Sequence, residues 1–210
     1  MKIFLITLTL VFGFLVHGNG QTITNQSSTT PVWTKADQQY LLDNLIRSKQ
    51  EIIDETKNLT KEQWGFKENP DRWNINQIVE HIALCEILLM HEISFALGRV
   101  PNPGNTNHSP DSLYVDNYPN ESKKQDALSY TKPFSFAIPL GNNEGSNNVI
   151  WLTTMRNESI DYLEEEKKNI RIHYDCFDNN VHQIYIMLFG HTDRHLKQIQ
   201  KVKVHPDYPK

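Results

Sequence analysis

Apolar residues recur every three or four positions in four stretches of the chain, which is the spacing of amphipathic helices. These stretches cover residues 34–59, 75–97, 148–168 and 181–203, the first and the last two with approximate ends. The second contains no Pro or Gly before Gly98 closes it. Four long helices of this kind predict an all-α fold.

Capping-box signals mark where the second helix and a short turn before it begin. Thr60 with Gln63, and Asn74 with Gln77, have a short polar residue followed three positions later by Gln. The run Asn69-Pro70-Asp71 between them interrupts the chain. Thr34 is the corresponding N-cap candidate for the first helix.

The third predicted helix, residues 148–168, has a wet side and an opposite side with large apolar residues. Trp151, Met155 and Tyr162 lie along one side of it. The acidic run at 164–166 is most simply a solvated face. We therefore expect the aromatic side to face the other helices.

The segment between the second and third helices, residues 98–148, has a different composition. It contains six prolines, at positions 101, 103, 110, 119, 133 and 139. A structureless connection of this length is unusual in a compact domain and tends to be functional or partly disordered. Within it, residues 134–138 alternate weakly and predict a short extended piece lying over the helices.

The N-terminus has the pattern of a secretory signal peptide. Lys2 supplies a positive charge, Ile3 to Val16 are almost wholly apolar, and Gly18-Asn19-Gly20 offers small residues for cleavage. The apolar stretch is shorter than the roughly 20 residues needed to cross a bilayer. We predict cleavage near Gly20, export to the periplasm or the medium, and no stable membrane insertion afterwards.

Residues 21–32, which would follow the cleavage point, are rich in Ser, Thr, Asn and Gln and predict a disordered leader. The single domain is expected to cover residues 33–210. Without Lys2 the net charge falls from −4 to about −5. This balance excludes nucleic acid as a partner, because binding it requires a basic surface.

The two cysteines, Cys85 and Cys176, are far apart in sequence and form no metal-binding spacing. In an exported chain they could form a disulfide, and two free thiols explain them equally well.

The candidate chemistry lies on the last helix, where His191 and His195 are one turn apart. Their side chains are separated by about 40° around the helix axis, so both point the same way. They share an apolar stripe with Ile184 and Leu188, which places them on the buried side. Thr192 follows His191 where a zinc protease would have Glu, so that class is excluded.

His81 strengthens the case for a metal site. It lies in the middle of the otherwise apolar second helix, and in an antiparallel bundle the last helix could be its neighbour. Burying imidazoles is costly unless their nitrogens find partners, and one shared cation would satisfy all three rings. Three histidines leave a coordination position open, as catalytic zinc sites do.

Two motifs resemble those of the DinB/YfiT-like metalloenzyme superfamily. The run from Trp73 to His81, WNINQIVEH, resembles the approach to the first ligand of that family, and HTDRHLKQI from His191 resembles its closing signature. The resemblance covers about residues 33–202. It implies an up-down-down-up four-helix bundle, with Zn²⁺ or Ni²⁺ held by His81, His191 and His195. The proline-rich segment is longer than the connection usual in the family.

The resemblance also implies a class of activity. Related proteins include metal-dependent hydrolases and enzymes that transfer low-molecular-weight thiols to electrophiles. We expect hydrolysis of a small molecule by a metal-activated water, with thiol S-transfer as the alternative. From another class, a non-catalytic protein with a metal clip between helices would also explain the three histidines.

Two further residues are candidates for the surroundings of the metal. Cys85 lies within about 40° of His81 on its helix and could line the cavity. Gln198 follows His195 by one turn and could orient a ligand through a hydrogen bond. No Asp or Glu is linked to the site by spacing, so a general base is expected from residues 98–148. The expected partner is a small-molecule substrate. The sequence leaves open whether the protein also forms a homodimer.

Overall fold

The computed structural model describes residues 30–105, 109–120 and 135–210, and the regular elements in these ranges are all helical. The longest are α1 (Lys35–Thr56), α3 (Ile75–Gly98), α6 (Ser146–Glu165) and α7 (Val181–Lys203). The shorter ones are α2 (Lys61–Gly65), α4 (Asp111–Asn120) and the 3₁₀ turns η2 (Ser135–Ala137) and η3 (Ile170–Ile172). The predicted all-α fold is confirmed.

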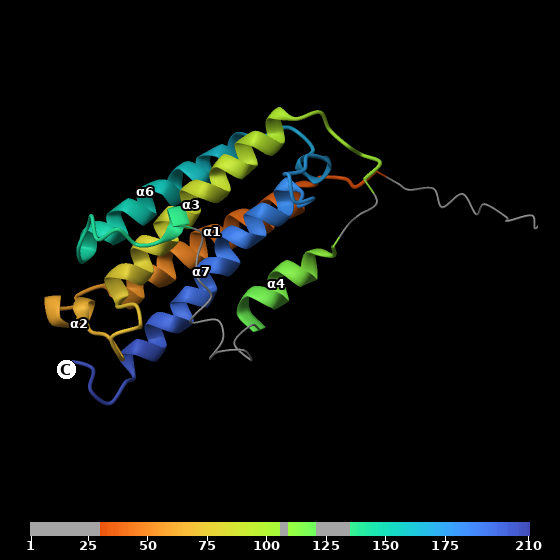
Figure 1. Cartoon of the computed structure of the whole chain (residues 1–210). Helices are drawn as coiled ribbons and strands as arrows, with labels where there is room; N and C mark the ends of the chain where they lie inside the picture. The colour runs from red at the N-terminus through yellow and green to blue at the C-terminus, as the bar shows by residue number, and fades with distance from the viewer. Residues whose placement is uncertain (1–29, 106–108, 121–134) are drawn as a thin grey trace, which may run out of the picture.

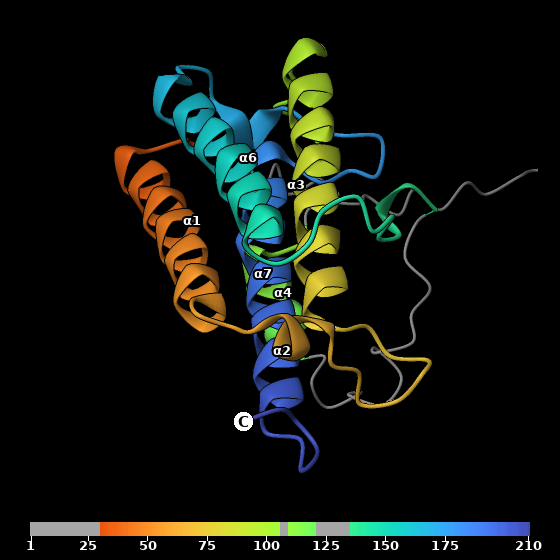
Figure 2. The same cartoon turned by 90° about the vertical axis from the view of Figure 1, so that its left-hand side faces the viewer.

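The four long helices form a bundle. α1 and α7 run in one direction and α3 and α6 in the other, as the colours in Figures 1 and 2 show. Each of α1 and α3 packs against both α6 and α7. This arrangement agrees with the expected up-down-down-up order, and it makes α3 and α7 neighbours.

Side-chain caps fix where the helices begin. The capping boxes at Thr34, Thr60 and Asn74 are all present, with the residue three positions later bonded back to the cap. A fourth box joins Asn180 and Gln183 at the start of α7. These caps satisfy backbone N–H groups that the first turn of a helix leaves without partners.

The apolar core consists of two clusters along the bundle. One surrounds the first half of α7 up to Phe189, and the other surrounds its second half from Leu196 onwards. Residues 190–195 of α7, which include His191 and His195, lie between these clusters. Buried polar side chains at this level of α7 include Thr192 and His195.

The proline-rich segment contains a helix, so the expectation of a structureless connection is wrong for residues 111–120. α4 packs along α7, and Tyr114 donates a hydrogen bond to Asn179 Oδ1 at 2.6 Å. Six consecutive residues of α7, 181–186, are buried as a result. Pro110 directly precedes α4, at an end where proline is tolerated because the first N–H groups of a helix have no helical partner.

The prediction of a short extended piece at 134–138 is also wrong. Residues 135–137 form the 3₁₀ turn η2, and Ala137 is buried against α3. The alternation of apolar residues arises because Phe136, Ile138 and Leu140 point outward from this turn and the loop after it.

The predicted signal peptide and most of the predicted leader lie outside the described residues, which begin at residue 30. Export, cleavage near Gly20 and the domain boundary at residue 33 therefore stay predictions. In the described part of the chain, no helix has the length and apolar character needed to cross a membrane.

Candidate metal centre

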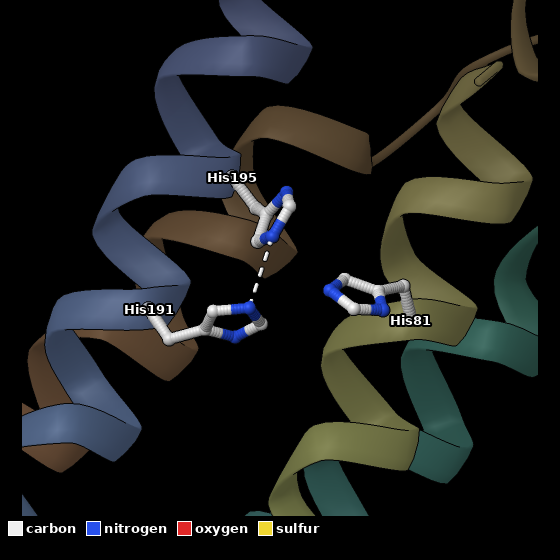
Figure 3. A group of neighbouring side chains, drawn as sticks. All are labelled: His81, His191 and His195. Carbon is white, nitrogen blue, oxygen red and sulfur yellow. Dashed lines mark hydrogen bonds between the residues drawn. The ribbon is translucent and has the colours of Figure 1, made fainter. Parts of the chain in front are cut away.

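Three histidines from two helices converge inside the bundle. His81 comes from α3, and His191 and His195 come from consecutive turns of α7 (Figure 3). One nitrogen of each ring lies within 4.8 Å of one nitrogen of each of the others. The Nε2 atoms of His191 and His195 are 3.0 Å apart. The structure thus brings together all three residues predicted as ligands.

Hydrogen bonds orient two of these rings. Nδ1 of His81 donates to the carbonyl oxygen of Ala137 at 2.6 Å, and Nδ1 of His195 donates to Gln198 Oε1 at 2.8 Å. A neutral imidazole carries one proton, so both Nε2 atoms are left as acceptors. Gln198 lies where the sequence placed it, and Ala137 is a partner that the sequence did not reveal. Partners of this kind fix the tautomer of metal-binding histidines.

The site favours neutral histidines. Burial lowers the pKa of His81, and burial together with the neighbouring rings lowers the pKa values of His191 and His195 well below their usual range. Metal ions bind the neutral imidazole. Two nitrogens bound to one ion at about 2.0–2.1 Å would lie about as far apart as Nε2 of His191 and Nε2 of His195 do. The residues present therefore fit a divalent cation.

The lowered pKa values predict that the metal-free protein loses stability in acid. Above about pH 6.5 the histidines are neutral in both states, and their pKa shifts leave stability unchanged. Below that value the unfolded chain binds protons that the folded chain rejects, so the free energy of unfolding falls by about 1.4 kcal/mol per pH unit for each such histidine. Urea unfolding in the presence of a chelator, between pH 7 and 5, measures this slope.

The variant His191→Asn identifies one of the histidines responsible. Because burial lowers the pKa of His191, removing this histidine should reduce the slope by about 1.4 kcal/mol per pH unit. Equal slopes in the wild type and His191→Asn would contradict the lowered pKa of His191.

Cys85 lies beside the site without joining the convergent nitrogens. Its Sγ is 3.6 Å from Nε2 of His81. Burial, with a smaller effect of the Glu86 carboxylate, raises the pKa of this thiol to about 12. Cys85 is therefore a protonated lining residue in the metal-free site. It is free, as is the exposed Cys176, so the structure contains no disulfide between them.

Trp73, the first residue of the motif that leads to His81, also reaches the site. Its ring packs on the His81 ring with centroids 4.8 Å apart and planes tilted by 50°. This contact covers one side of His81, and the Ala137 carbonyl holds the ring edge. The motif therefore supplies both a candidate ligand and part of its support.

Next to the histidines lies a buried polar network that the sequence did not predict. Glu86 is 2% exposed and Arg156 is 1% exposed. Two guanidinium nitrogens of Arg156 each lie 2.8 Å from a carboxylate oxygen of Glu86. Arg156 also donates to Ser48 at 2.7 Å and to Thr192 at 2.9 Å. The network joins all four long helices one residue away from Cys85 and His191.

This network corrects the expected face of α6. Trp151 and Met155 are only partly buried and Tyr162 is exposed, whereas Leu152, Arg156 and Ser159 face the core. The sequence spacing contained the signal, because Leu152, Arg156, Ser159 and Leu163 are spaced as one helical stripe. Charged side chains are rarely buried, so a stripe that contains Arg156 does not look like a buried face in the sequence.

The carboxylates closest in sequence to the histidines are engaged elsewhere. Glu80 accepts backbone N–H groups at residues 140–142, Glu86 pairs with Arg156, and Asp193 pairs with Arg47 at 2.9 Å. None of them belongs to the convergent group, which consists of the three histidines. A general base from residues 98–148 stays an expectation, and parts of that segment lie outside the described residues.

Comparison with known proteins adds an independent finding. The chain matches the sequence profile of the DinB superfamily over residues 44–199, about three quarters of its length. The match includes all three histidines. A search of curated proteins and a search of solved structures each return no significant match. By the extent of the profile match, together with its all-helical fold, this chain belongs to the DinB superfamily.

Proposed function

We propose that this protein is an exported metal-dependent enzyme that hydrolyses a small molecule at the site formed by His81, His191 and His195. The observation that carries the proposal is the convergence of nitrogens from three histidines inside the bundle. Membership of the DinB superfamily is compatible with a metal-binding enzyme. Zn²⁺ or Ni²⁺ is the proposed ion, because imidazole suits both.

When bound, such an ion supplies a water whose pKa is lowered to about 7 and which can act as a nucleophile. The residues of this chain hold and shape the position. His81 and His195 present Nε2 because their Nδ1 protons are held by Ala137 and Gln198. Trp73 and Cys85 flank His81. His81, His191 and His195 would hold the ion as three protein ligands, which would leave a position for water or substrate.

Hydrolysis can be tested with purified protein reloaded with Zn²⁺ or Ni²⁺ and supplied with panels of esters, amides and phosphoesters. We expect turnover of at least one class, lowered about 100-fold or more by a chelator and by His81→Ala, since metal catalysis supplies several kcal/mol. The exposed His91→Ala serves as the matched control and should retain full activity.

The alternatives give different results in the same preparation. Turnover only when a low-molecular-weight thiol is added with an electrophile would replace hydrolysis by S-transfer. Metal binding without any turnover, together with unfolding when the metal is removed, would indicate a clip between helices. Either result would contradict the proposed hydrolysis.

A further inference from the structure

The loop that precedes α6 crosses α3 at the metal centre. We call residues 135–145 the strap; it begins with η2 and ends where α6 starts (Figure 2). At its start, the carbonyl oxygen of Ala137 accepts the hydrogen bond from Nδ1 of His81. At its end, Gly145 N donates to Asn76 Oδ1 at 2.6 Å. Both bonds attach the strap to α3.

Between these two points, two buried side chains hold the strap: Asn148 Nδ2 of α6 donates to Asn143 O at 3.1 Å, and the carboxylate of Glu80 on α3 accepts from residues 140–142. Glu80 is 1% exposed, and its oxygens accept four close N–H contacts from three consecutive strap residues. Oε1 lies 3.0 Å from Leu140 N, 3.0 Å from Gly141 N and 3.3 Å from Asn142 N. Oε2 lies 2.9 Å from Gly141 N. In the described part of the chain, all four of these bonds to the buried carboxylate thus come from strap backbone groups.

The chemistry of this contact suits a carboxylate. An ionised carboxylate only accepts hydrogen bonds, and a cluster of backbone N–H groups only donates them. Bonds to a charged acceptor are roughly twice as strong as neutral ones. The N–H groups can converge because Gly141 has φ of +73°, a conformation that residues with a side chain rarely adopt. Glu80 therefore determines the path of the strap.

Glu80 and His81 are consecutive residues of α3, so the strap is fixed to the helix beside the histidine that it supports. We propose that Glu80 is a positioning residue of the metal centre. By anchoring the strap, it places the Ala137 carbonyl where it keeps the His81 proton on Nδ1 and leaves Nε2 available for a ligand. The link to metal affinity rests on the proposed function; the effect on the His81 tautomer does not.

The tautomer can be read directly in metal-free protein. Long-range ¹H–¹⁵N NMR correlations of ¹⁵N-histidine-labelled protein distinguish protonated Nδ1 from protonated Nε2. Wild type should show His81 protonated at Nδ1. In Glu80→Ala residues 140–142 lose their bonds to α3, and the His81 pattern should shift towards protonated Nε2. Zn²⁺ affinity, measured by competition with a chelating dye, should weaken about 10–100-fold.

Two further variants separate positioning from a general effect on folding. Glu80→Gln retains an oxygen at the Oε1 position, which receives three of the four contacts, so it should preserve the tautomer and most of the affinity. Gly141→Val leaves Glu80 unchanged but disfavours the positive φ, so it should reproduce the Glu80→Ala shift. Glu92→Ala removes a carboxylate from the same helix without touching the strap and should resemble wild type.

An unchanged His81 tautomer in folded Glu80→Ala, or in Gly141→Val if Glu80→Ala does not fold, would overturn the proposal. A shifted tautomer with unchanged Zn²⁺ affinity would overturn the link to the metal. A wild type that binds no Zn²⁺ would instead refute the proposed function, and the tautomer result would still decide the role of the strap.

Discussion

Replacing Arg156 by Met is expected to lower the free energy of unfolding by about 3–5 kcal/mol. The substitution leaves the Glu86 carboxylate buried without its cation, and the carboxylate cannot reach water because its side chain is 1% exposed. Removing one partner of a buried ion pair costs far more than the net contribution of the pair itself. Urea unfolding monitored by circular dichroism at pH 7 measures the loss.

The double variant Glu86→Leu/Arg156→Met provides the matched comparison. It removes both charges, and the hydroxyls of Ser48, Ser159 and Thr192 retain helix carbonyls as acceptors. It should therefore be more stable than Arg156→Met alone. Arg47→Met, which breaks a pair with Asp193 at the surface, should cost less than about 1 kcal/mol. Equal losses in Arg156→Met and Arg47→Met would contradict the role of the buried network.

The helices and their caps could be predicted from the sequence because their signals are local. A cap and its partner are three residues apart, and an apolar stripe repeats every three or four residues. The His191 and His195 pair is local in the same sense. His81 was linked to them through the expected bundle order and the resemblance, and the structure places its ring with theirs.

The support of the site could not be predicted, because it depends on contacts between residues distant in sequence. Glu86 and Arg156 are 70 positions apart, and His81 and Ala137 are 56 apart. The strap contributes backbone N–H and C=O groups, which every residue has. No residue type in the sequence therefore marks the contacts of Glu80 or of Ala137. α4 is not apparent in the sequence because prolines close to both of its ends are typical of loops.

Replacing His191 by Ala is expected to weaken Zn²⁺ binding by at least about 100-fold, beyond the 10–100-fold typical for residues that only support a ligand. Wild type should gain about 2.7 kcal/mol of stability when free Zn²⁺ is 100 times Kd. At that concentration His191→Ala should gain almost none. Thermal unfolding with and without buffered Zn²⁺ measures both effects.

His91→Ala is the control for this experiment, because His91 is an exposed histidine on α3 that lies outside the convergent group. Its stabilisation by Zn²⁺ should equal that of wild type. Equal stabilisation of wild type and His191→Ala would place the ion elsewhere on the protein.

The most direct test of the metal centre is X-ray absorption at the zinc edge of protein loaded with one equivalent of Zn²⁺. We expect one tightly bound ion per chain, coordinated by three imidazole nitrogens at about 2.0–2.1 Å and by one oxygen from water. A chain that binds no zinc, or a first shell with fewer than three imidazoles, would contradict the assignment of His81, His191 and His195.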